Sequence, residues 1–204
     1  MSKKLLDKFF REHVINSASP TAPALAHFYI KMESEPESNE KIQSALNNAV
    51  YEAQPGREEE ALAEREEIES ADTYEKIIRF MRQHTDPMNQ HTLVNKAMEF
   101  ENEIVPEIVR RLKTSLNDGF VETSIRILVK SDYDVDEIIG YYDNIRSPYT
   151  QSMILVMLGF KLDETHIPWL IEKYNELKNL YPHNSYCEGA YYALYEIDNR
   201  FYQQ

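Results

Sequence analysis

The chain has 204 residues, enough for one ordinary domain or a short repeat array with a sizeable core. Its single cysteine, Cys187, excludes a disulfide within the chain and a metal site built on cysteines, and it favours a reducing compartment. The formal net charge of −13 argues against nucleic acid as a partner, because duplex binding depends on neutralising phosphates.

The negative charge is concentrated in one segment. Residues 1–31 carry a formal charge of +3, residues 32–72 carry −10 and residues 73–204 carry −6. Such a surface attracts a basic partner, although acidity can also serve solubility alone. Asp7 and Glu12 interrupt the apolar core that a signal peptide needs, and no apolar run approaches the ~20 residues that span a bilayer. We therefore expect a cytoplasmic chain that does not bind membranes.

Apolar residues recur at intervals of three and four through the first third of the chain, which predicts amphipathic helices. Helices are expected at 3–15 and 22–33, the second with its apolar stripe at Leu25, Phe28, Tyr29 and Met32. A further stripe lies within residues 42–50 and ends before Pro55-Gly56. The acidic segment 57–70 offers only Ala61, Leu62 and Ile68 to a core, so it is either an exposed helix, which we prefer, or a mobile segment.

From residue 72 onward, helices and short turns alternate regularly. The first helices of the successive pairs are predicted at 72–84, 102–114, 134–145 and 163–180. The second helices run from the Asp86-Pro87 turn to Phe100, from the turn at 117–119 to Lys130, from Pro148 to Gly159, and from the turn at 183–185 to about Tyr202. The turns inside successive pairs are 32, 29 and 37 residues apart, counted from Asp86, Asp118, Ser147 and Asn184. A short turn at a nearly constant period is typical of stacked helical hairpins.

The stretch 155–177 holds the most specific motif. Leu158-Gly159 is expected to end one helix, Asp163 or Thr165 to cap the next, and Ile167-Pro168 to open it ahead of Leu170-Ile171. This pattern resembles the junction between HEAT-type repeats, closest to the variety named after phycobilisome lyases. Leu162 stands where that family prefers Gly, and His166 where it prefers Ala.

The resemblance covers about residues 72–204. It implies an all-α fold, a short right-handed α-solenoid of stacked antiparallel helix pairs with about 11–12 helices. The whole chain, 1–204, would form a single α-helical domain. Within it, residues 1–37 are divergent N-terminal helices, residues 38–71 an acidic segment that can form another repeat, and residues 72–204 the HEAT-like repeats.

The sequence carries no pattern typical of catalysis or metal binding. None of the six histidines pairs with another at the helical spacing of three or four, and Asp163 with His166 has no second copy. There is no nucleophile elbow and no phosphate-binding loop. Cys187 is expected about one turn inside a helix, which could lower its pKa, but packing is the simpler interpretation. We therefore predict no catalytic residues, no cofactor and no metal.

Aromatic residues concentrate near the C-terminal end. Ten of the fourteen tyrosines lie between Tyr141 and Tyr202, together with the only tryptophan. In the last helix one stripe should face inward: Ala190, Ala193, Leu194, Ile197 and Phe201. The tyrosines form a second stripe, which predicts a protein-binding surface of exposed aromatic and acidic residues, namely Tyr141, Trp169, Glu188, Tyr191, Tyr192, Tyr195 and Tyr202. The alternative is a wide terminal core that buries the tyrosine rings.

These features predict a non-enzymatic, protein-binding α-solenoid. It would sequester or neutralise a basic protein partner, as immunity and antitoxin proteins do. An enzyme of the lyase or DNA-glycosylase type, as found among HEAT-like solenoids, is the first alternative, and a scaffold subunit of a larger complex is the second. A glycosylase would need a basic groove for DNA, which the net charge disfavours.

Overall fold

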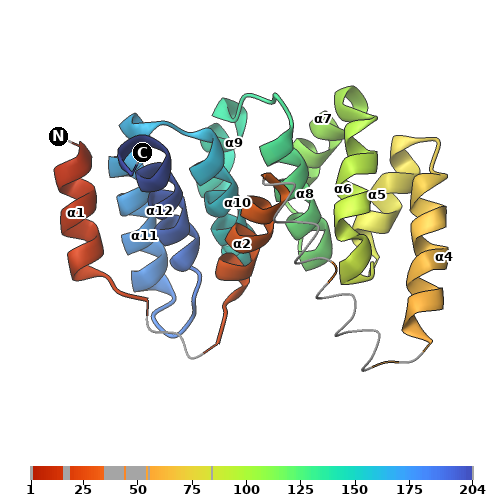
Figure 1. Cartoon of the computed structure of the whole chain (residues 1–204). Helices are drawn as coiled ribbons and strands as arrows, with labels where there is room; N and C mark the ends of the chain where they lie inside the picture. The colour runs from red at the N-terminus through yellow and green to blue at the C-terminus, as the bar shows by residue number, and fades with distance from the viewer. Residues whose placement is uncertain are drawn as a thin grey trace. The chain divides into compact units, whose positions relative to one another are not determined.

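The computed structural model describes residues 2–15, 19–34, 44, 54, 56–83 and 85–203. Helix accounts for 78% of these residues and no strand occurs among them, which confirms the all-α prediction (Figure 1). The described part of the chain holds eleven α-helices. The apolar stripe predicted within 42–50 lies outside the described residues.

The chain divides into two compact units. Unit 1 comprises Met1–Phe28 and Asp134–Gln204, and unit 2 comprises Tyr29–Tyr133. The helices of unit 1 are α1 (Ser2–Glu12), the first half of α2 (Ala22–Ser34), α9 (Asp136–Tyr141), α10 (Pro148–Lys161), α11 (Ile167–Leu180) and α12 (Glu188–Tyr202), with the 3₁₀ turns η2 (Tyr142–Asn144) and η3 (Glu164–His166). Unit 2 holds the rest of α2, α4 (Arg57–Glu69), α5 (Tyr74–Arg82), η1 (Pro87–Asn89), α6 (Gln90–Met98), α7 (Glu101–Leu112) and α8 (Asp118–Lys130).

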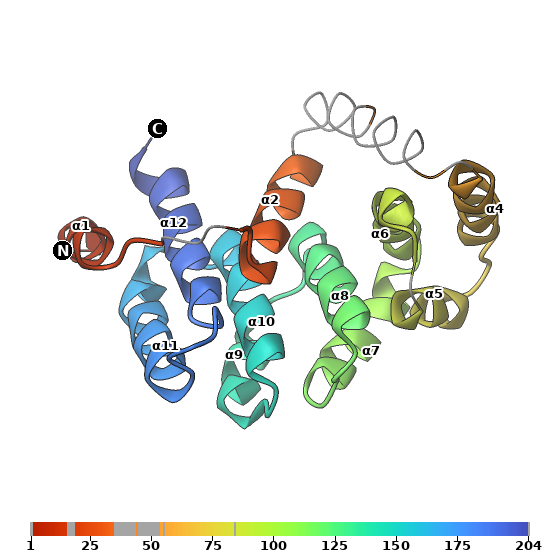
Figure 2. The same ribbon diagram turned by 90° about the horizontal axis from the view of Figure 1, so that it is seen from below.

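Helix α10 forms the centre of unit 1. Every residue from Ser152 to Gly159 is buried, as expected for a helix that is covered on all sides. It packs chiefly against α12, and α11 packs on α12 in turn. Helix α1, which follows the N-terminus, lies against α11 and α12 (Figure 2).

Gly159 corrects one prediction about α10. The helix does not end there but continues to Lys161, and Gly159 has no positive φ. A Cβ on Gly159 would lie 2.5 Å from Cα of Ala193, so the glycine serves the close approach of α10 and α12. The helix ends where Leu162 turns extended, and Arg200 donates hydrogen bonds to the carbonyl oxygens of Gly159 and Leu162 at 2.8 and 3.0 Å.

The acidic segment 57–70 is a helix, as predicted. Gly56, with φ of +91°, makes the turn into α4, and Ala61 and Ile68 are buried while six glutamates of the helix remain exposed. Buried Asn89 holds α4 in place by donating to the Ala61 carbonyl oxygen and to Glu64, each at 2.7 Å. In the rest of unit 2, α5, α6 and α7 all pack on α8.

Helix α2 buries only part of the predicted stripe: Met32 is buried and Tyr29 half-buried, as predicted, but the other two residues are not. Leu25 and Phe28 are 41% and 46% exposed, whereas Ala26, His27 and Ile30 are buried. The helix is turned so that His27 faces α12, where its Nε2 lies 3.0 Å from a carboxylate oxygen of Glu196. Each partner of this pair needs the other, because either one alone would be buried without a hydrogen bond.

Candidate functional site

Unit 1 contains every residue of the predicted binding surface. Tyr141 ends α9 and is buried, Trp169 lies in the first turn of α11 and is half-buried, and the other five residues are on α12. Pro168 occupies the first turn of α11 and Asp163 caps η3 by accepting a hydrogen bond from the amide of Thr165 at 2.9 Å. From Asp163 onward, the junction that positions Trp169 is therefore formed as the sequence predicts.

The tyrosine face of α12 is covered by the N-terminal helices of the chain. Tyr191 packs edge-on against Phe10 of α1, with ring centroids 5.3 Å apart. Tyr192 stacks on His27 of α2 at 5.3 Å and an interplanar angle of 26°. Both tyrosines are half-buried, so this part of the predicted surface is an internal contact of unit 1.

Charged pairs hold the same contact together. Glu196 and Asp198 of α12 are 1% and 4% exposed, and each has a basic partner from the N-terminal helices. His27 lies 3.0 Å from Glu196, and Lys3 donates to Asp198 at 2.7 Å. Glu188, predicted as a binding residue, accepts a hydrogen bond from Thr21. Because buried carboxylates need partners, these pairs place α1 and α2 on α12.

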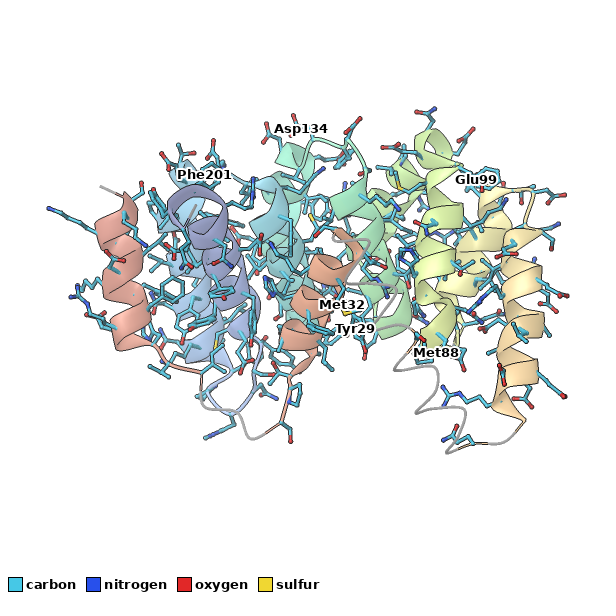
Figure 3. All side chains as sticks on the ribbon, viewed as in Figure 1. Tyr29, Met32, Met88, Glu99, Asp134 and Phe201 are labelled. Carbon is cyan, nitrogen blue, oxygen red and sulfur yellow. The ribbon has the colours of Figure 1, made fainter. Side chains whose placement is uncertain are left out.

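The outer residues of α12 remain accessible. Tyr195 is 41% exposed, and so is Phe201, which was predicted to face the core and instead lies at the outer surface of the helix (Figure 3). The Tyr202 hydroxyl donates to Glu164 at 2.8 Å, and the Lys3 ammonium lies 5.4 Å from the centre of its ring. Tyr202 therefore ties the end of α12 to η3 and α1.

Trp169 is held in a fixed orientation at the surface. Its ring meets Tyr142 edge-on, with centroids 5.4 Å apart. The Lys173 ammonium lies 5.9 Å from the Trp169 ring and 5.8 Å from the Tyr142 ring, within cation–π range. Lys173 is only 4% exposed and donates to Asp143 at 2.7 Å and to Glu176 at 2.9 Å.

The titration of this cluster follows from its burial. Burial alone would lower the pKa of Lys173, but the hydrogen bonds to Asp143 and Glu176 outweigh it, and the pKa of Lys173 lies above its ordinary value. Burial also raises the pKa of Tyr142, whose hydroxyl is buried without a hydrogen-bond partner. Lys173 is thus a permanent cation beneath Trp169, and Tyr142 stays neutral.

Cys187 differs from its prediction. It is the residue before α12 rather than one turn inside the helix, and it is half-buried. Burial raises the pKa of its thiol, with a smaller contribution from Glu188. A helix N-terminus would lower that pKa, but here burial decides the direction. The thiol is therefore no activated nucleophile.

Two further properties concern the described residues only. No three His, Cys, Asp or Glu side chains among them are grouped so that they could hold a metal ion. None of the helices in that part of the chain has both the length and the apolar character that crossing a membrane requires.

No family model, curated protein or solved structure matches this chain. The HEAT-type resemblance therefore rests on the motif in 155–177 and on the repeat period. Sequence reasoning missed the role of His27, Phe10 and Lys3 as the cover of α12. One feature of the sequence could have indicated this contact. Residues 1–31 carry a net positive charge, whereas the tyrosine-rich C-terminal end is acidic.

Proposed function

We propose that this protein is a non-enzymatic, protein-binding module that holds a basic protein partner, in the manner of an immunity or antitoxin protein. The observation that carries the proposal is the environment of Trp169. Its indole is half-exposed, fixed by Tyr142 and Lys173, and accompanied by the exposed carboxylates Asp143, Glu172 and Glu176. We call this group of four residues, Trp169 with the three carboxylates, the Trp169 surface.

The charge of the Trp169 surface favours a basic partner. Asp143 and Glu176 share the single cation of Lys173, and Glu172 has no cationic partner among the described residues. Three carboxylates against one buried ammonium leave two negative charges beside the indole. A basic surface would complement them and would be attracted at long range by the acidic chain.

Tryptophan is one of the residue types that contribute most to protein binding, together with tyrosine and arginine. It is enriched among the few interface residues whose truncation costs 2 kcal/mol or more, roughly, because it buries a large ring with little loss of rotamer freedom. Here the Lys173 contacts already restrict the ring before binding, which lowers the entropic cost of association further.

The finer architecture is part of the same proposal. We infer a short right-handed α-solenoid of stacked antiparallel helix pairs. Its support, besides the resemblance, is the contact pattern inside unit 2, where α6 contacts α7 and α8, and α5 contacts α6 and α7. The contact of α5 with α8 reaches one helix further, but all of these contacts join helices that lie near one another in the sequence, which is typical of helical repeats.

The test uses three immobilised baits, the wild type and the variants Trp169→Ala and Phe201→Ala, with lysate of the native source. Phe201→Ala removes an exposed aromatic ring from unit 1 without touching the Trp169 surface. We expect quantitative mass spectrometry to find a basic protein on the wild type and on Phe201→Ala, depleted at least tenfold on Trp169→Ala. The purified partner should also bind Glu172→Lys more weakly than wild type.

Two outcomes would sink the proposal. One is a partner that all three baits retain equally, which would place the binding surface elsewhere. The other is a partner with an acidic surface, which would contradict the electrostatic argument. Far-ultraviolet circular dichroism of each bait shows whether a loss of binding reflects unfolding instead.

A further inference from the structure

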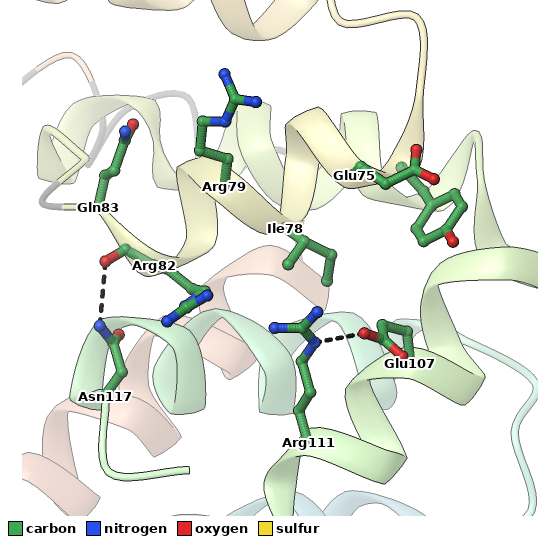
Figure 4. Close-up of a pocket in the computed structure, with 9 residues that line it drawn as sticks. Glu75, Ile78, Arg79, Arg82, Gln83, Glu107, Arg111 and Asn117 are labelled. Carbon is green, nitrogen blue, oxygen red and sulfur yellow. Dashed lines mark hydrogen bonds and ion pairs between the residues drawn. The ribbon is translucent and has the colours of Figure 1, made fainter.

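Unit 2 contains a groove lined by arginines, formed by α5, α7 and the turn that precedes α8 (Figure 4). Its volume is about 480 Å³. A second hollow, of about 520 Å³, shares Arg82, Arg111 and Asn117 with the first. Arg79 and Arg82 come from the last turn of α5, and Arg110 and Arg111 from the last turn of α7. We call these two joined hollows the arginine groove.

Only part of the positive charge in the arginine groove is neutralised. Glu107 accepts hydrogen bonds from Arg110 at 2.7 and 2.8 Å and from Arg111 at 2.5 Å, and these hold its pKa at about 2. Arg79 and Arg82 have no hydrogen bond or ion pair from their side chains to any described residue. In Figure 4 the guanidinium groups of Arg82 and Arg111 point toward one another across the groove.

The balance of charge stays positive after the helix ends are counted. Four arginines face two glutamates, Glu75 and Glu107, which leaves a formal charge of +2. The C-terminal ends of α5 and α7 contribute about −0.5 each, so roughly +1 remains. Unit 2 as a whole has thirteen lysines and arginines against twenty-two acidic residues, a net charge of −9. A positive groove in so acidic a unit requires a reason other than solubility.

The rim of the arginine groove is held by Asn117. Its side-chain amide donates to the carbonyl oxygen of Arg82 at 3.1 Å, and its Oδ1 accepts from the amide of Phe120 at 2.7 Å. Asn117 thereby joins the end of α5 to the start of α8. Arg82 is thus carried by a fixed backbone, which reduces the entropy lost when its guanidinium binds a ligand.

The size and charge of the groove fit a compact anion. A volume of about 480 Å³ lies within the range of roughly 300–1,000 Å³ that small-molecule sites occupy. An extended polyanion such as nucleic acid would be repelled by the net charge of the unit, whereas a small anion meets mainly the guanidinium groups. A phosphate monoester carries about −1.5 to −2 at pH 7, and its three oxygens match the planar fork of arginine.

We propose that the arginine groove binds a small phosphate monoester, with its phosphoryl oxygens on Arg82 and Arg111. The unpaired guanidinium of Arg82 supplies the principal contact, and Arg111 uses the nitrogens that Glu107 leaves free. Tyr74 and Ile78 offer apolar surface to the organic part of the ligand. The site is independent of the Trp169 surface, which belongs to unit 1.

The experiment titrates phenyl phosphate into the isotopically labelled full chain at low ionic strength and follows the backbone amide signals of Gln83 and Asn117. Binding should be saturable, and Arg82→Gln should weaken it at least tenfold. Arg146→Gln is the matched control, because it removes one exposed arginine of unit 1 and the same net charge. It should change the affinity less than twofold, as should Trp169→Ala.

Three results would overturn the proposal. The first is the absence of saturable signal changes in the wild type. The second is an equal loss of affinity in Arg82→Gln and Arg146→Gln, which would mean that the anion responds only to net charge. The third is tighter binding of succinate than of phenyl phosphate, which would assign the groove to dicarboxylates.

Discussion

Replacing Gly159 by alanine should destabilise unit 1. The added Cβ would lie 2.5 Å from Cα of Ala193 and 3.0 Å from its carbonyl oxygen. Carbon atoms pack best at about 3.5–4.0 Å, so α10 and α12 would have to separate locally by roughly 1 Å. Neither obstacle can rotate away, because both are backbone atoms inside a helix.

The change in the free energy of unfolding is the difference between a packing cost and a gain in helix propensity. Adding a methyl group to a packed interior costs about 1–3 kcal/mol, and a backbone obstacle places this change near the upper end. Alanine also improves helix propensity over glycine by about 1 kcal/mol. We therefore expect the free energy of unfolding to fall by about 2 kcal/mol.

Gly140 provides the matched control. It lies in α9 of the same unit, it is exposed, and a Cβ there would meet nothing within 4 Å. Gly140→Ala adds the same methyl group and should stabilise the unit by about 0.4–1 kcal/mol, because it restricts only the unfolded chain. The two variants should thus move in opposite directions.

Urea unfolding followed by the fluorescence of Trp169 measures both variants. Trp169 is the only tryptophan and lies in unit 1 with both glycines, so the signal does not require the two units to unfold together. A loss of about 2 kcal/mol should lower the urea midpoint by roughly 1 M. If Gly159→Ala is as stable as the wild type, or if both variants shift the same way, the close approach of α10 and α12 is refuted.

Three further outcomes are expected. Leu170→Ala should lower the free energy of unfolding by about 2–5 kcal/mol because Leu170 is fully buried. Leu180→Ala, at a position 70% exposed, should change it by less than about 0.5 kcal/mol, and equal urea midpoints of the two variants would contradict this expectation. Burial alone would raise the pKa of Glu33, but hydrogen bonds from His91 and Arg126 lower it below 4.5. The stability that the charged carboxylate contributes is therefore present above pH 4.5 and is lost as the pH falls through the lowered pKa. The hydrogen-exchange protection factors of α8 amides, which are corrected for the intrinsic pH dependence of exchange, should fall more on acidification in the wild type than in Glu33→Gln. Identical changes would count against the pair. Iodoacetamide should modify Cys187 more slowly than free cysteine at pH 7.5, because burial raises its pKa; a faster reaction would show an activated thiol.

The local signals of the sequence located the helices well. The turns at Asp86-Pro87, Asn117 and Ser147-Pro148 all precede helices, and the side chain of each polar residue accepts the capping hydrogen bond. Asp163 caps η3 in the same way, and Pro168 lies in the first turn of α11. Such signals are reliable because a cap, or a proline that lacks an amide hydrogen, acts within three or four residues of its own position.

The candidate site was predicted only in part. The off-stripe position of Trp169 correctly indicated a residue that is not fully buried, and Tyr195 is exposed. The second stripe of α12 was predicted to be an exposed binding surface, whereas Tyr191 and Tyr192 are half-buried against the N-terminal helices, closer to the alternative of a wide terminal core. The stripe could not indicate what covers these tyrosines, since Phe10 and His27 lie far away in the sequence and their own helices show no motif.

The sequence by itself therefore determined the fold class, the positions of most helices and the acidic character of the chain, because each depends on composition or on neighbours within one helical turn. Only the tertiary structure decided which face of α2 is buried, why Gly159 is a glycine and where four arginines meet. The His27–Glu196 pair joins residues 169 apart in sequence and the Lys3–Asp198 pair residues 195 apart. Whether such side chains meet depends on the packing of whole helices, which no local pattern records.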